Sequence, residues 1–270
     1  MSKSKAHIAK PSAHISKPNT QQRRHTIIAL LNEQGEVTVD ELAQRFATSE
    51  VTIRKDLTAL ENNGLLLRRY GGAVLVPSDM VAERINEPIS PQKQALAKAA
   101  AERIRDHNRI IIDSGSTTAA LLGELAHKHG LVVMTNSLMV ANALRELEPE
   151  PTLLMTGGTW DASSESFQGQ VAEQVLRSYD FDQLFIGADS IDLERGTTTF
   201  NELTALSRVM AEVAREVVVM VESDKIGRKI PNLELPWCAI HTLVTDSGIT
   251  TEQQQQLEQK GINLIIAPKS

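Results

Sequence analysis

Residues 38–57 read TVDELAQRFATSEVTIRKDL, and this stretch decides the fold of the first part of the chain. Thr38 and Glu41 have the spacing of a capping box, in which each side chain bonds a backbone amide at the start of a helix. Ser49 offers a second helix N-cap after a short turn. The stretch therefore predicts two short helices joined by a tight turn, the second over 50–62.

The flanking segments complete a winged helix-turn-helix. Upstream, Ile27, Leu30 and Leu31 recur at helical spacing, which predicts a first helix over 21–32. Downstream, residues 64–76 read GLLLRRYGGAVLV, two β-prone arms around a glycine pair, as is typical of a wing. Three helices followed by a wing form a small DNA-binding module.

The third predicted helix has a face suited to DNA. Its Ile53, Leu57 and Leu60 share the opposite face and are expected in the core. The exposed face and the wing carry cations and short side chains that can contact phosphates and base edges. The candidate DNA-binding residues are Ser49, Val51, Thr52, Arg54, Lys55, Thr58, Arg68 and Arg69. An ordinary solvated face is the alternative, which the capped second helix and the basic wing disfavour.

Length and charge distribution favour a two-part chain. Its 270 residues exceed the size at which a single core usually stops growing. Residues 1–76 carry 11 lysines and arginines against 7 aspartates and glutamates, whereas residues 77–270 carry 17 against 27. A basic head before an acidic body fits a nucleic-acid module joined to a regulatory domain.

Neither a membrane span nor a metal site is expected. No apolar run approaches 18 residues, and the first residues lack the apolar segment of a secretory signal. The single cysteine, Cys238, cannot form an internal disulfide and is expected to be a buried, inert thiol. These features favour a cytoplasmic protein without a cofactor.

The chain is expected to divide into four parts. They are a disordered tail at 1–20, the winged helix-turn-helix at 21–76, a linker at 77–90 and an effector domain at 91–268. The tail holds a proline-containing repeat that forbids a continuous helix. Ser90 and Pro91 are suited to start the first helix of the effector domain.

Beyond Pro91, apolar runs alternate with helical patterns. The runs occupy 109–113, 131–135, 152–156, 183–187, 217–221, 241–245 and 263–267. Alternating strands and helices predict an α/β fold, an open and mainly parallel sheet with helices on both faces.

Polar turns follow four of these predicted strands. The first, DSGSTT over 113–118, precedes a helical pattern over 119–126 and offers amides and hydroxyls to a phosphate, although an ordinary capped turn is equally consistent with it. Open α/β sheets bind ligands at the carboxyl ends of their strands, and such polar groups suit a sugar phosphate. The candidate effector-binding residues are Asp113, Ser114, Gly115, Ser116, Thr117, Thr118, Thr135, Asn136, Ser137, Thr156, Gly157, Gly158 and Asp189.

Three ordered motifs, at 35–43, 49–57 and 69–73, resemble the DeoR family of bacterial repressors. Lys55 stands where the family usually has a second arginine and Tyr70 where it often has histidine, so no base preference is implied. The resemblance covers about residues 20–268 and implies an effector domain with the fold of sugar-phosphate isomerases. In that domain 113–118 would hold the phosphate, while Asp189, Glu202 and Lys225 would line the sugar. A surface lysine in a loop is the alternative for Lys225.

The same resemblance implies particular partners. The runs at 134–137, 155–158, 166–167 and 192–196 resemble family members that regulate amino-sugar use. Galactosamine 6-phosphate and N-acetylgalactosamine 6-phosphate are therefore the candidate effectors. Operator DNA is the expected macromolecular partner, read by a homodimer or tetramer because a single helix-turn-helix contacts too little DNA for strong specificity.

These patterns predict a repressor of a sugar or amino-sugar catabolic operon that a phosphorylated sugar releases from its operator. The alternative is an isomerase-type enzyme with an accessory DNA-binding domain, which would need a general base. Asp113, Asp189, Glu202 and Lys225 could supply one, but a winged helix on the same chain gives the pocket a sensing role, so no catalytic residue is predicted. The polar turns disfavour a third possibility, an architectural DNA-binding protein.

Overall fold

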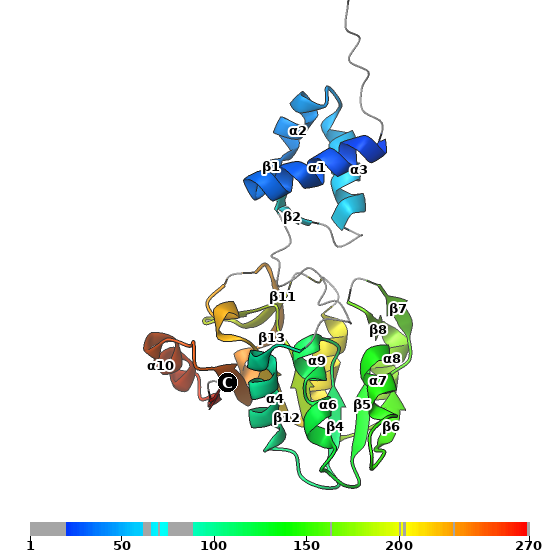
Figure 1. Cartoon of the computed structure of the whole chain (residues 1–270), viewed down its shortest axis with the longest axis vertical. Helices are drawn as coiled ribbons and strands as arrows, with labels where there is room; N and C mark the ends of the chain where they lie inside the picture. The colour runs from blue at the N-terminus through cyan, green and yellow to red at the C-terminus, as the bar shows by residue number, and fades with distance from the viewer. Residues whose placement is uncertain are drawn as a thin grey trace, which may run out of the picture. The chain divides into compact units, whose positions relative to one another are not determined.

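The computed structural model describes residues 20–61, 66–69, 71–74, 89–162, 164–199, 201, 204–228 and 230–268 (Figure 1). The chain divides into two compact units, residues 1–81 and residues 82–270. The expected tail up to residue 19, the linker up to residue 88, Tyr70 and Glu202 lie outside the described residues.

The first unit is a three-helix domain with a small antiparallel sheet. Its elements are α1 (Thr20–Gln34), β1 (Glu36–Thr38), α2 (Val39–Arg45), α3 (Glu50–Glu61), β2 (Leu67–Arg69) and β3 (Gly72–Val74). The capping box at Thr38 and Glu41 is present, so the predicted helices and wing are confirmed. The sequence did not reveal β1, which pairs with β3. A side chain at Gly72 would come within 2.2 Å of the Val37 carbonyl oxygen, so this close pairing requires glycine.

The core of this unit fixes the orientation of α3. Ile53, Leu57 and Leu60 are buried, as the helical spacing predicted. Asp56 on the same helix is also buried, and its carboxylate accepts hydrogen bonds from Arg23 Nε at 2.5 Å and Arg24 Nε at 2.9 Å. This ion pair ties α3 to α1.

The second unit is built on a seven-stranded sheet. Its strands are β4 (Arg109–Ile112), β5 (Val132–Thr135), β6 (Thr152–Met155), β9 (Phe181–Ile186), β12 (Ala214–Met220), β14 (Thr242–Asp246) and β15 (Asn263–Ala267). Their order is β15-β14-β12-β9-β4-β5-β6, and every neighbouring pair is parallel. All seven predicted strands are therefore confirmed. The strand order reverses direction between β4 and β9, which makes that junction the topological switch point.

Helices cover both faces of this sheet, as predicted. One face packs against α4 (Pro91–Ala101), α5 (Ser116–Ala119), α6 (Leu122–Leu125) and α7 (Leu138–Leu144), and the other against α8 (Gln170–Leu176), α9 (Ala205–Glu212) and α10 (Thr251–Gln259). Ser90 caps α4 and Pro91 begins it, as expected. The single helix expected over 119–126 is instead the two short helices α5 and α6.

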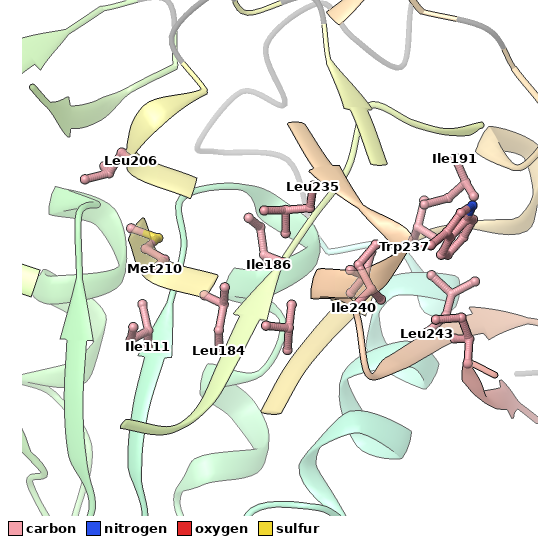
Figure 2. Close-up of a cluster of buried hydrophobic side chains, with 14 of the residues drawn as sticks. Ile111, Leu184, Ile186, Ile191, Leu206, Met210, Leu235, Trp237, Ile240 and Leu243 are labelled. Carbon is pink, nitrogen blue, oxygen red and sulfur yellow. The ribbon is translucent and has the colours of Figure 1, made fainter. Parts of the chain in front are cut away.

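Two small antiparallel sheets were not predicted. One pairs β7 (Thr159–Asp161) with β8 (Ser166–Gln168), and the other joins β10 (Ser190–Asp192), β11 (Gly196–Thr199) and β13 (Asn232–Pro236). Strands of three to five residues are too short to show a clear alternation in the sequence. Figure 2 shows Leu235 of β13 pointing into the core beside Ile186 of β9, so the second small sheet is anchored near the switch point.

Two short 3-10 turns follow in this unit, η1 (Ser223–Lys225) and η2 (Trp237–Ala239). In η2 the indole of Trp237 is buried, whereas Cys238 is exposed. The expectation of a buried thiol is wrong, because the apolar run around Cys238 forms the 3-10 turn η2, which buries Trp237 and leaves Cys238 at the surface. No helix among the described residues has both the length and the apolar character needed to cross a membrane.

Candidate DNA interface and effector site

The start of α3 is fixed by its N-cap. Ser49 Oγ accepts a hydrogen bond from the Thr52 amide at 3.3 Å, and the two hydroxyl oxygens lie 3.0 Å apart. Ser49 and Thr52 therefore have a structural role in addition to the DNA contact predicted for them.

The structure brings most of the other DNA-binding candidates together. Val51, Arg54, Lys55, Thr58 and Ala59 of α3 line an open hollow of about 370 Å³ with Arg68 of β2. Arg68 Nη1 donates a hydrogen bond to Thr58 Oγ1 at 3.0 Å, which joins the wing to the helix. Val51 is 59% exposed, and an exposed apolar side chain on such a face suits contact with a thymine methyl group.

The four cations of this face differ in their partners. Arg54 pairs with Glu50 at 2.6 Å, and Arg68 lies 4.0 Å from Glu61. Within the described part of the chain, the side chains of Lys55 and Arg69 have no hydrogen-bond or ion-pair partner. Lys55 and Arg69 are thus the cations that can bind phosphate without first breaking an internal pair.

The predicted effector residues meet at the switch point of the large sheet. Asp113 directly follows β4, and Asp189 follows β9, the neighbouring strand. The Asp113 amide donates to the Phe185 carbonyl oxygen at 3.0 Å, so the turn is held against β9. This junction is where open α/β sheets form a ligand crevice.

Asn136 links its own turn to the turn after β4 and to β8. Its Nδ2 donates to Asp113 Oδ1 at 2.8 Å, and its Oδ1 accepts from the Ser114 amide at 3.0 Å. Its backbone carbonyl oxygen accepts a hydrogen bond from the Phe167 amide at 2.8 Å. The residue is buried, with only 1% of its surface exposed. Asn136 therefore sets the position of Asp113 more directly than it offers itself to a ligand.

Several predicted effector residues form the turns themselves. Thr118 is fully buried, and its hydroxyl donates to the Asp113 and Gly115 carbonyls, each at 2.8 Å. Thr135 and Ser137 bond backbone amides of the turn into α7, and Thr156 bonds the Gly157 carbonyl. A side chain at Gly158 would come within 2.5 Å of the Gln168 carbonyl oxygen. These residues shape the crevice, and the side chain of Thr117 is buried with them.

A lysine that the sequence did not reveal lies at the predicted phosphate turn. Lys93 of α4 donates from Nζ to Ser116 Oγ at 2.8 Å. It stands 23 residues before that serine, so only the packing of α4 brings it there. Its ammonium group supplies the cation that the turn over 113–118 lacks in its own sequence.

Lys225, which the resemblance placed in the site, is 8% exposed. Its backbone carbonyl accepts a hydrogen bond from Ser190 Oγ at 3.0 Å, beside Asp189. Its ammonium group has no partner within the described part of the chain. The alternative of a surface lysine is wrong, since η1 buries the side chain.

Glu234 was also missed by the sequence reasoning. It lies on β13, where Ser207 Oγ of α9 donates to its Oε1 at 2.8 Å and Thr197 forms a second hydrogen bond. Burial, and then the charge of Asp113, raises the pKa of Glu234 to about 8, and burial raises the pKa of Asp113 to about 6. No local signal marks Glu234, because β13 and its neighbours come from distant parts of the chain.

A second hollow, of about 350 Å³, lies at the opposite edge of the large sheet. Its lining includes Arg109, Arg177 and Arg215. Arg109 packs over the rings of Tyr179 and Phe181, Arg177 pairs with two glutamates, and Arg215 lies 3.7 Å from Asp182. Because these cations already have partners, and because the hollow is at the amino ends of the strands, it does not compete with the switch point as the effector site.

Comparison with known proteins covers both units. A model of the DeoR-like helix-turn-helix domain matches residues 23–79, and a model of the DeoR C terminal sensor domain matches residues 90–247. A protein of Escherichia coli O157:H7, provisionally named an aga operon transcriptional repressor, is 41% identical over 254 residues, which are 92% of this chain and 94% of that protein. The HTH-type transcriptional regulator GolR of Listeria innocua is 31% identical over 251 residues, 91% of this chain and 98% of that protein.

Among solved structures, ribose 5-phosphate isomerase A from Methanocaldococcus jannaschii matches with a TM-score of 0.36 and 20% identity. The match covers 50% of this chain and 53% of that enzyme. This structural likeness is much weaker than the sequence relationships, which extend over nearly the full length of the relatives.

Proposed function

The chain belongs to the DeoR family of transcriptional regulators, and on that premise we propose that it represses a sugar or amino-sugar catabolic operon until a phosphorylated sugar binds. The relatives that match over nearly their whole length are transcriptional regulators, so the protein is a DNA-binding regulator and not an enzyme. The observation that carries the proposal is the combination, on one chain, of a cationic hollow on α3 and a polar switch point with two lysines.

The DNA half of the proposal assigns separate roles to the candidates on α3 and the wing. Lys55 and Arg69, which have no partner within the described part of the chain, bind phosphates. Arg54 and Arg68 also bind phosphates, after releasing the glutamates with which they pair in the free protein. Val51, Thr52 and Thr58 face the base edges, where short side chains read methyl groups and hydrogen-bonding atoms.

The effector half places a phosphate beside Lys93 and the turn over 113–118, with Ser114, Gly115 and Ser116 supplying amides and hydroxyls. Asp113 and Asp189 bind sugar hydroxyls, and Lys225 contributes a second positive charge. Glu202 remains an expected contact. The aga name of the 41% identical relative supports an amino-sugar effector, with galactosamine 6-phosphate and N-acetylgalactosamine 6-phosphate as the two candidates.

Effector binding weakens repression by favouring an arrangement of the DNA-binding units that does not fit the operator. This coupling requires at least two copies, so a homodimer or tetramer in the cytoplasm reads repeated half-sites.

Fluorescence anisotropy with DNA from upstream of neighbouring sugar-catabolism genes tests the proposal. Tight, sequence-specific binding should be released by one hexose phosphate and not by the unphosphorylated sugar. Tight binding that no phosphate ester changes would remove the effector assignment, and the absence of specific DNA binding would overturn the proposal as a whole.

A further inference from the structure

Among the described residues, two partly buried carboxyl groups at the switch point have no arginine partner, unlike several other carboxylates of the protein. Asp56 bonds Arg23 and Arg24, Asp192 bonds Arg195, and Glu216 bonds Arg103. Within the described part of the chain, Asp113 is bonded by Asn136 and Ser114, and Glu234 by Ser207 and Thr197. Neutral donors compensate a buried negative charge only in part, so a cationic group from a ligand would stabilise both carboxylates.

These carboxyl groups converge with a third. Thr197 and Thr199 are two residues apart on β11 and therefore project to the same face of that strand. Thr199 Oγ1 donates to Asp189 Oδ2 at 2.7 Å, and Thr197 bonds Glu234, so the two carboxyl groups share one face of β11. After burial, the charge of Asp113 is the largest cause that raises the pKa of Glu234, which places Asp113 nearby as well.

Glu234 lies at an irregularity of the pairing between β13 and β11, where the register shifts between Gly196 and Thr198. Ser207 of α9 and Thr197 of β11 hold its carboxyl group at that position.

The cationic side of the crevice complements this acidic cluster. Lys93 contacts the turn over 113–118, and Lys225, a residue that is 8% exposed, has no partner for its ammonium group in the described part of the chain. An ammonium group that is partly removed from water is stabilised when an anion binds it. A ligand with a phosphate at one end and a protonated amine at the other would satisfy both sides.

We propose, building on the proposed function, that Glu234 acts with Asp113 and Asp189 to select an effector carrying a free, protonated amine, that is, an amino-sugar phosphate rather than its N-acetylated or hydroxyl counterpart. An ammonium group donates three hydrogen bonds and carries a full charge. An acetamido group is neutral and larger, and a hydroxyl group is neutral, so neither compensates the carboxylates.

Proton exchange should accompany the selection. At neutral pH the free protein holds a proton on Glu234, because burial and the charges of Asp113 and Asp189 raise its pKa to about 8. Arg208, the nearby cation on α9, bonds the backbone carbonyl oxygens of Leu233 and Glu234. A bound ammonium would favour the ionised carboxyl and expel the proton.

The test is isothermal titration calorimetry of the full-length protein at pH 7 with galactosamine 6-phosphate, N-acetylgalactosamine 6-phosphate and galactose 6-phosphate. The amine ester should bind at least about tenfold more tightly than the other two, which one charge-assisted hydrogen bond can supply. Titrations in two buffers of different ionisation enthalpy should show proton release with the amine ester alone. Glu234→Gln should abolish both the preference and the proton release, whereas Glu258→Gln on the exposed face of α10 should retain both.

The outcomes separate this inference from the proposed function. If none of the three esters binds, the proposed sugar-phosphate sensor is wrong. If all three bind equally, or the N-acetyl ester binds most tightly, the selection by Glu234 is overturned while the sensor stands. The comparison of esters on the unmodified protein does not depend on any variant, and Asp113→Asn provides a second neutral substitution should Glu234→Gln fail to fold.

Discussion

The two units of this protein differ in how they compensate sheltered carboxyl groups, of which Asp56 is buried and Asp113 and Glu234 are partly buried. In the DNA-binding unit, Asp56 is clamped by two arginines of α1, so the charge is compensated within the domain. At the switch point of the sensor unit, Asp113 and Glu234 have only neutral donors within the described residues. The difference indicates which charges stabilise the fold and which can recognise a ligand. The following predictions test that distinction.

The largest effect is expected from Asp56→Asn, which leaves two partly buried arginines without their carboxylate. Breaking a buried ion pair on one side typically destabilises a domain by about 3–5 kcal/mol. Urea unfolding followed by circular dichroism should show this loss in the transition of the DNA-binding unit, and operator binding should fall with it. Asp40→Asn, in the exposed first turn of α2, is the control and should cost only a few tenths of a kcal/mol. A loss below about 1 kcal/mol for Asp56→Asn would show that the clamp does not hold α3.

A smaller effect, confined to ligand response, is expected from Lys93→Ala. If Lys93 binds the effector phosphate, removing its ammonium should weaken effector binding by about 1.5–3 kcal/mol and leave affinity for free operator DNA unchanged. Lys98→Ala provides a matched control, because Lys98 is an exposed lysine of the same helix. Anisotropy titrations of the effector against the protein–operator complex measure both quantities. An unchanged effector midpoint for Lys93→Ala would move the phosphate away from the turn over 113–118.

The contrast between the units also explains what the sequence could predict. The helix-turn-helix depends on local signals, such as the capping box at Thr38 and the spacing of Ile53 and Leu57, and each is complete within a few residues. The strands of the large sheet are continuous apolar runs and were equally visible. Lys93 and Glu234 depend on packing between distant segments, α4 against the phosphate turn and β13 against β11. Nothing in their immediate sequence distinguishes them from surface residues.

At the DNA interface, the cations without an internal partner should determine how strongly operator affinity depends on salt concentration. Removing the two cations without internal partners, by Lys55→Ala with Arg69→Ala, should lower the slope of log affinity against log salt by about 2. Between 50 and 200 mM salt, the loss of affinity should then shrink by about tenfold. The double variant Lys98→Ala with Lys260→Ala, which removes two exposed cations of the sensor unit, should leave the slope unchanged. A slope that is equal for both double variants would remove Lys55 and Arg69 from the interface.

The most gradual effect should come from the sensor unit's own titration. Because the pKa of Glu234 is raised from 4.5 to about 8 in the folded protein, the neutral form is favoured on folding. The stabilising contribution of Glu234 is complete below about pH 4.5 and is lost as the pH rises through about 8. The contribution of Asp113 is lost in the same way as the pH rises from 3.8 to about 6. Urea unfolding of the effector-free protein between pH 5 and 8 should therefore show stability falling with pH, with a slope that Glu234→Gln reduces by at most about one proton. Equal slopes for the two proteins would mean that Glu234 is ionised at neutral pH before any ligand arrives, and the carboxyl group would then face water rather than the enclosed acidic cluster.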